Sequence, residues 1–189
     1  NQYLRNSVAD HITGAISACE GIRNNLVILN GPIGCKTYYT FSGVDSVVRR
    51  SDLWSLRGEL QLEDAMDDHL LGSARTPATN LRYTDYIFGT GEQLHRALND
   101  FFAERKYDLF PVIQTPGTSL LGEALEPELD EISSEFQIPH LFIESPAFSE
   151  NSMIGYDETT VRLMELLCDR TSSGNKDTAT PRVNLFGFD

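Results

Sequence analysis

The stretch Gly31-Pro32-Ile33-Gly34-Cys35 contains the residues of this chain best suited to chemistry. It follows the apolar run Leu26–Leu29 and predicts a strand, a glycine-rich turn and a helix that opens near the cysteine. A thiol at a helix N-terminus lies beside unpaired N–H groups and the positive end of the helix dipole, which favour the thiolate. Thiolate is the form that binds metals or attacks electrophiles. The alternative is a tight crossover turn in which Cys35 only packs, since buried free cysteines are common.

Short apolar runs alternate along the chain with segments of helical period. One apolar stripe runs from Leu94 to Phe102, and a second is formed by Val161, Met164, Leu167 and Cys168. Apolar strands that alternate with helices indicate a parallel sheet covered on both faces. We therefore expect an α/β protein, a three-layer Rossmann-like domain with a mostly parallel central sheet flanked by helices. The predicted strands are Leu26–Leu29, Tyr86–Phe88, Leu109–Ile113, His140–Ile143 and Val183–Phe186.

Turn-rich loops follow these strands at 30–34, 89–91, 115–119 and 145–152. In an open α/β sheet such loops gather beyond the carboxyl ends of the strands, where ligands bind. The sequence thus brings glycines, hydroxyl groups and Cys35 to one edge, which is the default site. The candidate cofactor-binding residues at this edge are Gly31, Pro32, Gly34, Thr118 and Ser119.

Composition excludes several classes of function. The chain carries 15 basic and 28 acidic residues, a net charge of −13, which argues against nucleic acid because a basic face is needed to neutralise phosphates. The charge also argues against an anionic membrane surface, and no apolar run approaches the roughly 20 residues of a membrane span. No signal peptide is visible. Three cysteines form an odd, sparse set that suits a reduced, cytoplasmic protein better than a disulfide framework.

Familiar cofactor motifs are incomplete. Gly89-Thr90-Gly91 opens like a dinucleotide fingerprint, but Leu94 stands where the third glycine belongs. The chain has no Walker lysine, and its four histidines show no ligand spacing. We therefore do not expect this chain to bind a nucleotide.

The ends of the chain predict a piece of a longer protein. It starts at Asn1 without methionine and finishes on a strand-like run. We predict that residues 1–189 form a single N-terminal domain, and that 171–182, rich in small polar residues, is a surface loop.

Four stretches resemble the component 1 subunits of nitrogenase and their relatives, among them the light-independent protochlorophyllide reductases and the cofactor-assembly scaffold proteins. Gly14-Ala15 followed by Asn30–Cys35 resembles the family's Gly-Ala helix and its His-Gly-Pro-x-Gly-Cys turn. Thr84–Glu92 resembles the family's "FGGEE" strand and helix start.

The other two stretches lie further along. Thr115–Glu123 resembles the "STCxTELIGDD" loop, and Pro146–Ser149 with Gly155-Tyr156-Asp157 resembles "TPxFxGS…GWD". Each motif is short, but all four occur in the family's order and at matching spacing.

The resemblance implies a particular fold, cofactor and set of partners. Family subunits consist of three Rossmann-like domains, and this chain resembles the first. In the family, this domain helps to hold an iron–sulfur cluster between two unlike subunits. The cluster passes electrons from an ATP-driven, dimeric iron protein to the substrate site. The implied partners are a second component 1-type subunit, or a copy of this chain, and the iron protein.

The family's cluster ligands are only partly present. Three cysteines per subunit usually ligate the cluster; Cys35 stands at the second position, Asp10 at the first and Pro116, which lacks a ligand atom, at the third. The resemblance makes Cys35 and Asp10 candidate metal ligands, and a partner with three cysteines would complete a four-ligand site. An aspartate ahead of a helix is also a common N-cap. Cys19 and Cys168 are predicted to pack in the core.

The residue after Gly155 bears on the type of subunit. The catalytic α-type nitrogenase subunit has a substrate-site histidine there, whereas the β-type subunit has an aromatic residue followed by aspartate. Tyr156 and Asp157 therefore make this chain more β-like. This argues against direct dinitrogen chemistry, although dinitrogen, a tetrapyrrole and a carbon–sulfur compound all stay open as substrates.

Two functions stay open. In the first, the chain is the first domain of a nitrogenase-like oxidoreductase subunit, with Cys35 bound to a cluster at a subunit interface. In the second, it is a cluster-less scaffold or binding relative for a tetrapyrrole or a metal-cofactor precursor, which the missing third cysteine favours. A third interpretation, a flavodoxin-like small-molecule domain of unrelated ancestry, would be supported by the fold class alone. The substrate stays open, and these residues alone are predicted to be catalytically inactive.

Overall fold

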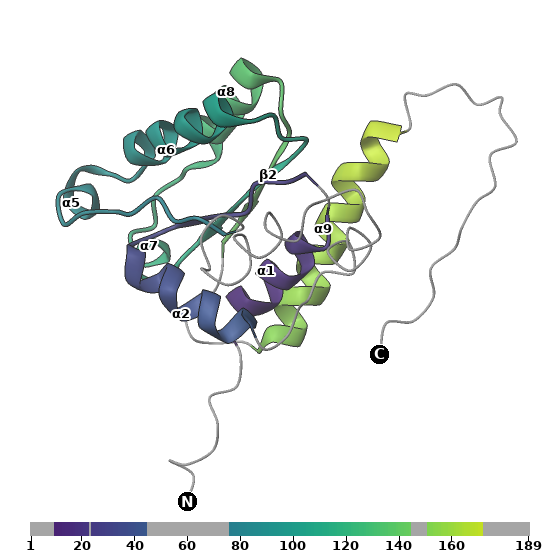
Figure 1. Ribbon diagram of the computed structural model, residues 1–189, viewed down its shortest axis with the longest axis horizontal. Helices are drawn as coiled ribbons and strands as arrows, with labels where there is room; N and C mark the ends of the chain where they lie inside the picture. Colours follow the sequence, from purple (N-terminus) through teal and green to yellow (C-terminus); the bar gives the residue numbers. More distant parts are fainter. Residues whose placement is uncertain (1–9, 23, 45–75, 145–150, 172–189) are drawn as a thin grey trace, which may run out of the picture.

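The computed structural model describes residues 10–22, 24–44, 76–144 and 151–171 (Figure 1). The predicted strand Val183–Phe186, the side chain of Cys168 and the predicted loop after residue 171 lie outside the described residues. The helices are α1 (His11–Glu20), α2 (Ile33–Val44), α5 (Asp85–Phe88), α6 (Gly91–Glu104), α7 (Pro116–Ser119), α8 (Glu126–Phe136) and α9 (Ser152–Thr171), and the strands are β1 (Ile28–Asn30), β2 (Phe110–Gln114) and β3 (His140–Ile143).

The sheet in the described part of the chain has three parallel strands in the order β1-β2-β3. Ile28 pairs with Val112, which pairs in turn with Phe142. Every strand residue except His140 is buried, as expected for a parallel sheet covered on both faces. The predicted parallel α/β architecture is therefore confirmed, and β3 has the predicted boundaries.

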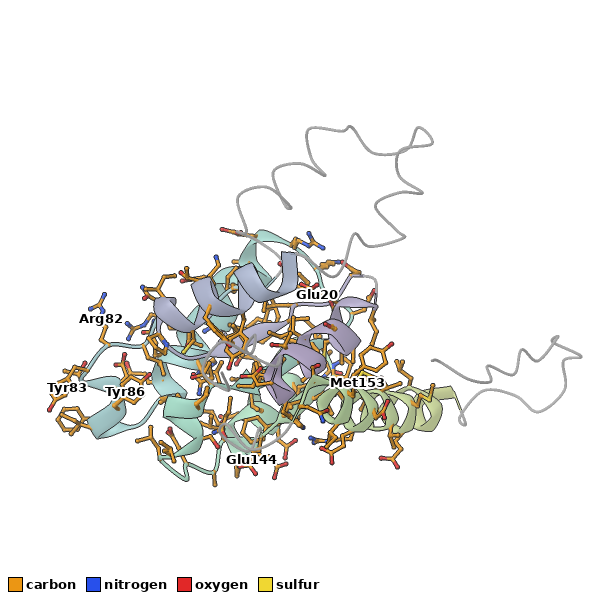
Figure 2. The ribbon with its side chains drawn as sticks, turned by 90° about the horizontal axis from the view of Figure 1, so that it is seen from below. Glu20, Arg82, Tyr83, Tyr86, Glu144 and Met153 are labelled. Atoms are coloured by element: carbon orange, nitrogen blue, oxygen red, sulfur yellow. The ribbon has the colours of Figure 1, made fainter. Side chains whose placement is uncertain are left out.

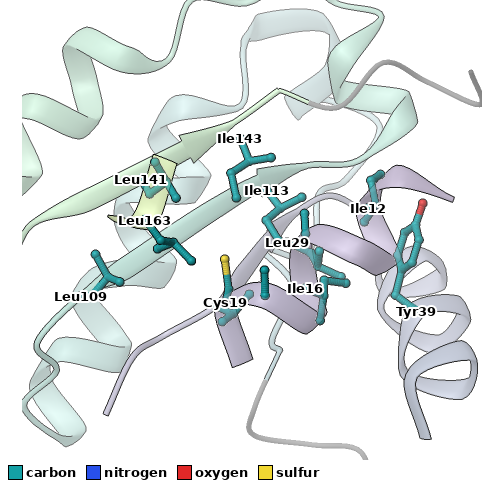
Figure 3. Packing of buried hydrophobic residues seen from close by; sticks show 13 residues of the cluster. Ile12, Ile16, Cys19, Leu29, Tyr39, Leu109, Ile113, Leu141, Ile143 and Leu163 are labelled. Atoms are coloured by element: carbon teal, nitrogen blue, oxygen red, sulfur yellow. The ribbon is translucent and has the colours of Figure 1, made fainter. Parts of the chain in front are cut away.

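Alternate strand residues face two separate cores. Ile28 and Val112 pack with apolar residues of α6 and α8. Leu29 and Ile113 point to the other face and pack with α1 and with Leu163 of α9 (Figure 3). Helices α6 and α8 thus lie on one side of the sheet and α1 and α9 on the other (Figure 1). This arrangement confirms the predicted three layers.

The predicted strand at Tyr86–Phe88 is wrong, because these residues form the single turn of α5. The Asp85 carboxylate accepts a hydrogen bond of 2.6 Å from the N–H of Arg82. Local capping of this kind favours a turn, and a run of three apolar residues is too short to outweigh it. The side chain of Phe88 is consequently 86% exposed instead of buried in a sheet.

The stripe predicted on α9 is not its buried face. Val161, Met164 and Leu167 are between 43% and 54% exposed. The buried positions follow a spacing of i, i+4 and i+8 instead and are Gly155, Thr159 and Leu163. The glycine decides which face turns inward, because it allows α9 to approach α1 closely.

Helices α1 and α9 cross at two glycines. Gly14 lies against backbone atoms of Ser152 and Tyr156, and Gly155 lies against the backbone of His11. Any side chain at either glycine would overlap main-chain atoms that cannot rotate away. Two of the motifs noted in the sequence therefore serve helix packing. Within the described ranges, no helix combines the length and apolar character needed to cross a membrane.

Candidate functional site

Two of the predicted loops meet at the carboxyl edge of the sheet. Gly31, directly after β1, packs so closely on the side chain of Thr115 that a Cβ would not fit between them. The hydroxyl groups of Thr115 and Thr118 each lie 2.9 Å from the carbonyl oxygen of Asn30. The structure thus brings the Gly31–Cys35 turn and the Thr115–Ser119 loop together, as the sequence predicts.

Asn30, the last residue of β1, is the centre of a buried hydrogen-bond network. Its side-chain amide donates to the hydroxyl of Thr90 at 2.9 Å and its side-chain oxygen accepts from Thr79 at 3.0 Å. The Thr79 hydroxyl also accepts from the N–H of Gly31 at 3.0 Å. Asn30, Thr79 and Thr90 are at most 1% exposed. Because buried polar groups are costly when unpaired, this network fixes the loops relative to one another.

Cys35 occupies the third position of α2, and its side chain is partly exposed. The sulfur lies at the margin of the core formed with α1, within hydrogen-bond reach of the Thr115 hydroxyl. Burial raises the pKa of the Cys35 thiol, while its interaction with the Thr115 side chain acts in the opposite direction. Burial thus opposes the thiolate form that a helix N-terminus is expected to favour. Metal binding would release the proton.

Asp10 is the N-cap of α1. One carboxylate oxygen accepts hydrogen bonds from the N–H of Thr13 at 3.0 Å and from its hydroxyl at 2.9 Å. The other accepts from the phenol of Tyr39 at 2.8 Å. Tyr39 lies one helical turn after Cys35 on α2, so it connects the two candidate ligands. Burial and the nearby Asp10 carboxylate raise the pKa of Tyr39, which therefore keeps its proton.

Two further predicted positions lie on the short helix α7, after β2. Pro116 is buried at the first position of α7, and Ser119 closes that short helix through a 2.9 Å bond from its N–H to the carbonyl of Thr115. The ring of Tyr86 lies over Gly117 and close enough to Cys35 to interact with it electrostatically. This edge therefore combines a thiol, hydroxyl groups and aromatic rings.

An iron–sulfur cluster needs four ligands, so the donor groups at this edge decide whether it could hold a cluster. No group of three or more His, Cys, Asp or Glu side chains with metal-site geometry occurs among the described residues. Cys35 fits as a single thiolate donor, whereas both Asp10 oxygens already accept hydrogen bonds. The described residues could therefore supply one ligand to a cluster, and its other ligands would have to come from elsewhere.

A hollow of about 500 Å³ opens beside this edge, at the start of α6. Glu123 accepts hydrogen bonds from the N–H of Thr90 at 2.9 Å and from its hydroxyl at 2.7 Å, which connects the hollow to the Asn30 network. Burial raises the pKa of Glu128 in its wall. The charged side chains that line it are Asp85, Glu92, Arg96, Glu123 and Glu128.

Cys19 is a core residue, as predicted, and lies on α1 among apolar side chains (Figure 3). Burial raises its pKa to about 12. We expect iodoacetamide to modify Cys35 in the folded protein but Cys19 only after unfolding in urea, because the reagent needs both access and thiolate. Peptide mass spectrometry would locate the modified residues. Equal rates at both cysteines before unfolding would contradict this placement.

The roles of Asn30 and Tyr39 at the site were not predicted from the sequence, although a sequence feature pointed to each. Asn30 is a polar residue that ends an apolar strand, and Tyr39 follows Cys35 by four residues, which places both on one face of a helix. Their partners Thr79 and Asp10 are distant in sequence, so the contacts themselves could not be read from it.

The fold and the site together define a class of protein: an α/β domain whose parallel sheet carries a thiol at its carboxyl edge. A family model described as "Nitrogenase component 1 type Oxidoreductase" matches residues 11–189. The chain therefore belongs to the nitrogenase component 1 type oxidoreductase family. This confirms the resemblance noted in the sequence.

Individual relatives are distant. The chain is 24% identical over 150 residues to the nitrogenase iron-molybdenum cofactor biosynthesis protein NifE of Clostridium pasteurianum, a match that covers 79% of this chain and 28% of NifE. It is 22% identical over 162 residues to the nitrogenase molybdenum-iron protein beta chain of Methanothermobacter marburgensis, covering 82% of this chain and 30% of that one. The chain thus spans less than a third of the length of these relatives.

A solved structure titled "Nitrogenase Cp1 at pH 6.5" has a similar fold. It superimposes with a TM-score of 0.59 at 16% identity, over 81% of this chain and 29% of the other. This likeness supports the α/β fold independently of the sequence match.

Proposed function

We propose that this chain is the first domain of a nitrogenase-like oxidoreductase subunit that helps to hold an iron–sulfur cluster at a subunit interface. The observation that carries the proposal is the position of Cys35. It is partly exposed at the carboxyl edge of the sheet, on the turn that matches the family's cysteine turn. A thiol that was buried in the core, or that lay away from this edge, could not bind a cluster at such an interface.

In this function, Cys35 supplies one thiolate and the partner subunit supplies the others. When bound, the cluster would accept and pass on single electrons, delivered by a dimeric, ATP-dependent iron protein. The chain's own contribution is to position the sulfur. The Thr115 hydroxyl lies near this sulfur and donates to the carbonyl of Asn30, which ties the loop after β2 to the turn that carries Cys35. A reduced compartment such as the cytoplasm suits the unpaired Cys19 and Cys35.

The test is anaerobic purification of the full-length protein, together with any component 1-type subunit that is encoded beside it. We expect a visible absorption band with matching iron and acid-labile sulfide. The Cys35→Ala variant should lose at least half of both, and Cys19→Ala should retain them, because only Cys35 lies at the edge. Full iron and sulfide in Cys35→Ala would reject the ligand assignment.

A cluster-less scaffold or binding relative is the second candidate. The presence of proline at the third ligand position favours it, as does the use of both Asp10 oxygens in hydrogen bonds. In that case the edge of the sheet would hold a tetrapyrrole or a metal-cofactor precursor. A colourless protein that binds such a compound with unchanged affinity in Cys35→Ala would support this candidate.

A further inference from the structure

Helix α2, which carries the candidate thiolate ligand, is attached to the core mainly through one side chain. Among its side chains that the structure describes, those of residues 33–39, only Tyr39 is buried, at 5% exposed. Ile33 is 56% and Tyr38 51% exposed on the same helix. The Tyr39 ring packs in the core near Ile12 of α1 (Figure 3). Because the other described side chains of α2 are at least partly exposed, the contacts of Tyr39 largely set how α2 lies on α1.

The phenol of Tyr39 is bonded to the residue that begins α1. It donates to Oδ2 of Asp10 at 2.8 Å, while Oδ1 of the same carboxylate caps α1 through the N–H and the hydroxyl of Thr13. Burial and the Asp10 carboxylate raise the pKa of Tyr39, so the phenol keeps its proton and stays the donor. One carboxylate therefore joins the starts of two helices.

Asp10 is itself fixed from a third side. Its backbone forms an antiparallel bridge with Asn151, directly before α9. The side-chain oxygen of Asn151 accepts hydrogen bonds at the start of α9, from the N–H of Met153 at 3.0 Å and from that of Ile154 at 3.2 Å. Since α1 and α9 also cross closely at their glycines, the position of Asp10 is set independently of α2.

Cys35 lies between two points at which its segment is held. Before it, the N–H of Gly31 donates to the Thr79 hydroxyl at 3.0 Å. After it, Tyr39 follows by four residues and therefore lies on the same face of α2. The Cys35 side chain contacts only the margin of the core. Loss of the second point would therefore allow the first turn of α2 to shift and the sulfur to move with it.

We propose that Asp10 is a positioning residue, which fixes α2 through the hydrogen bond from Tyr39 and so holds the Cys35 sulfur at the edge of the sheet. The proposal deepens the proposed function, on which it rests for the use that is made of this sulfur. It gives the residue at the family's first ligand position a different task. A metal bound at Oδ2 would compete with Tyr39 for that oxygen, so Asp10 acts on the site through Cys35 instead of as a ligand.

The experiment is the alkylation of the iron-free, full-length protein by iodoacetamide at one fixed pH, with Cys35 and Cys19 followed separately by peptide mass spectrometry. We expect Tyr39→Phe to raise the rate at Cys35 about fivefold, the factor that corresponds to one lost hydrogen bond. The rate at the buried Cys19 should not change. The matched control is Tyr83→Phe, which removes the same hydroxyl from a tyrosine that is 82% exposed at one extremity of the molecule (Figure 2).

Two substitutions of Asp10 separate the hydrogen bond from the charge. Asp10→Asn should react like the wild type, because the amide keeps the cap and its NH₂ group can donate to the phenol oxygen of Tyr39. Asp10→Ser should react like Tyr39→Phe, because serine is a good N-cap whose single oxygen is used by the cap. The double variant Asp10→Ser/Tyr39→Phe should be no faster than either single variant, since both remove the same bond.

A wild-type rate at Cys35 in Tyr39→Phe would overturn the proposal, as would an equal rise at Cys19, which would mean general loosening. A faster reaction in Asp10→Asn with no change in Tyr39→Phe would show that the charge acts instead. Iron and sulfide are measured on separate samples purified anaerobically. Loss of iron in Asp10→Asn but not in Tyr39→Phe would make Asp10 a ligand and overturn this inference alone. Absence of iron from every form would contradict the proposed function alone.

Discussion

Gly155→Ala is expected to lower the free energy of unfolding by about 3 kcal/mol, at the upper end of the cost of overpacking. The added methyl group would overlap the backbone of His11, which cannot rotate out of the way. The higher helix propensity of alanine offsets at most about 1 kcal/mol of this cost. Urea unfolding followed by circular dichroism would measure the difference.

Gly34→Ala is the matched control, because Gly34 also lies in a helix but a Cβ there meets no atom within 4 Å. It should leave the protein unchanged or stabilise it by up to about 1 kcal/mol. If both substitutions changed the free energy of unfolding equally, the close crossing of α1 and α9 would be refuted.

Asn30→Ala is the second change with a large expected effect, a loss of about 3 kcal/mol in the free energy of unfolding. It removes one hydrogen-bond partner from each of the Thr79 and Thr90 hydroxyls, both of which are buried. The loss should not depend on pH, since no titrating group is removed. Urea unfolding at neutral and at mildly acidic pH would measure it. Asn99→Ala, at an exposed position of α6, is the control and should stay within about 0.5 kcal/mol of the wild type.

Asn30→Asp separates hydrogen bonding from charge at the same position. The new carboxylate would be buried near Glu123, so its pKa in the folded protein would lie above the ordinary value for aspartate. A raised pKa means that the folded state binds the proton more tightly, and the lost stability therefore returns as the pH falls through it. A penalty that grew with acidification would contradict the buried position of this network.

Elements that depend on local periodicity could be predicted from the sequence. Strand β3 has the predicted bounds, and the stripe from Leu94 to Phe102 lies on the buried side of α6. These predictions succeed because strand and helix periods place apolar residues on a face before any tertiary contact forms. The fold class followed from the alternation of such segments.

Features that depend on contacts between distant segments could not be predicted. The buried face of α9 is set by Gly155 against α1, a contact that outweighs the more apolar stripe at Val161. The Asn30 network joins loops that are far apart in the sequence. Cys35 was singled out by its place at a predicted helix N-terminus and Asp10 by the family resemblance, but their connection through Tyr39 required the structure.

The hydrogen bonds of Asn30 have a consequence for how this protein can diverge. One residue ties the threonines at 79, 90, 115 and 118 to the end of a strand. A substitution at any one of these threonines changes the hydrogen bonds of Asn30 and therefore the positions of the other three. We therefore expect substitutions in these loops to occur together. The loops that carry these threonines are therefore constrained as a group. Among homologues, sequence variation should be concentrated outside them, on the helices that face away from this edge of the sheet.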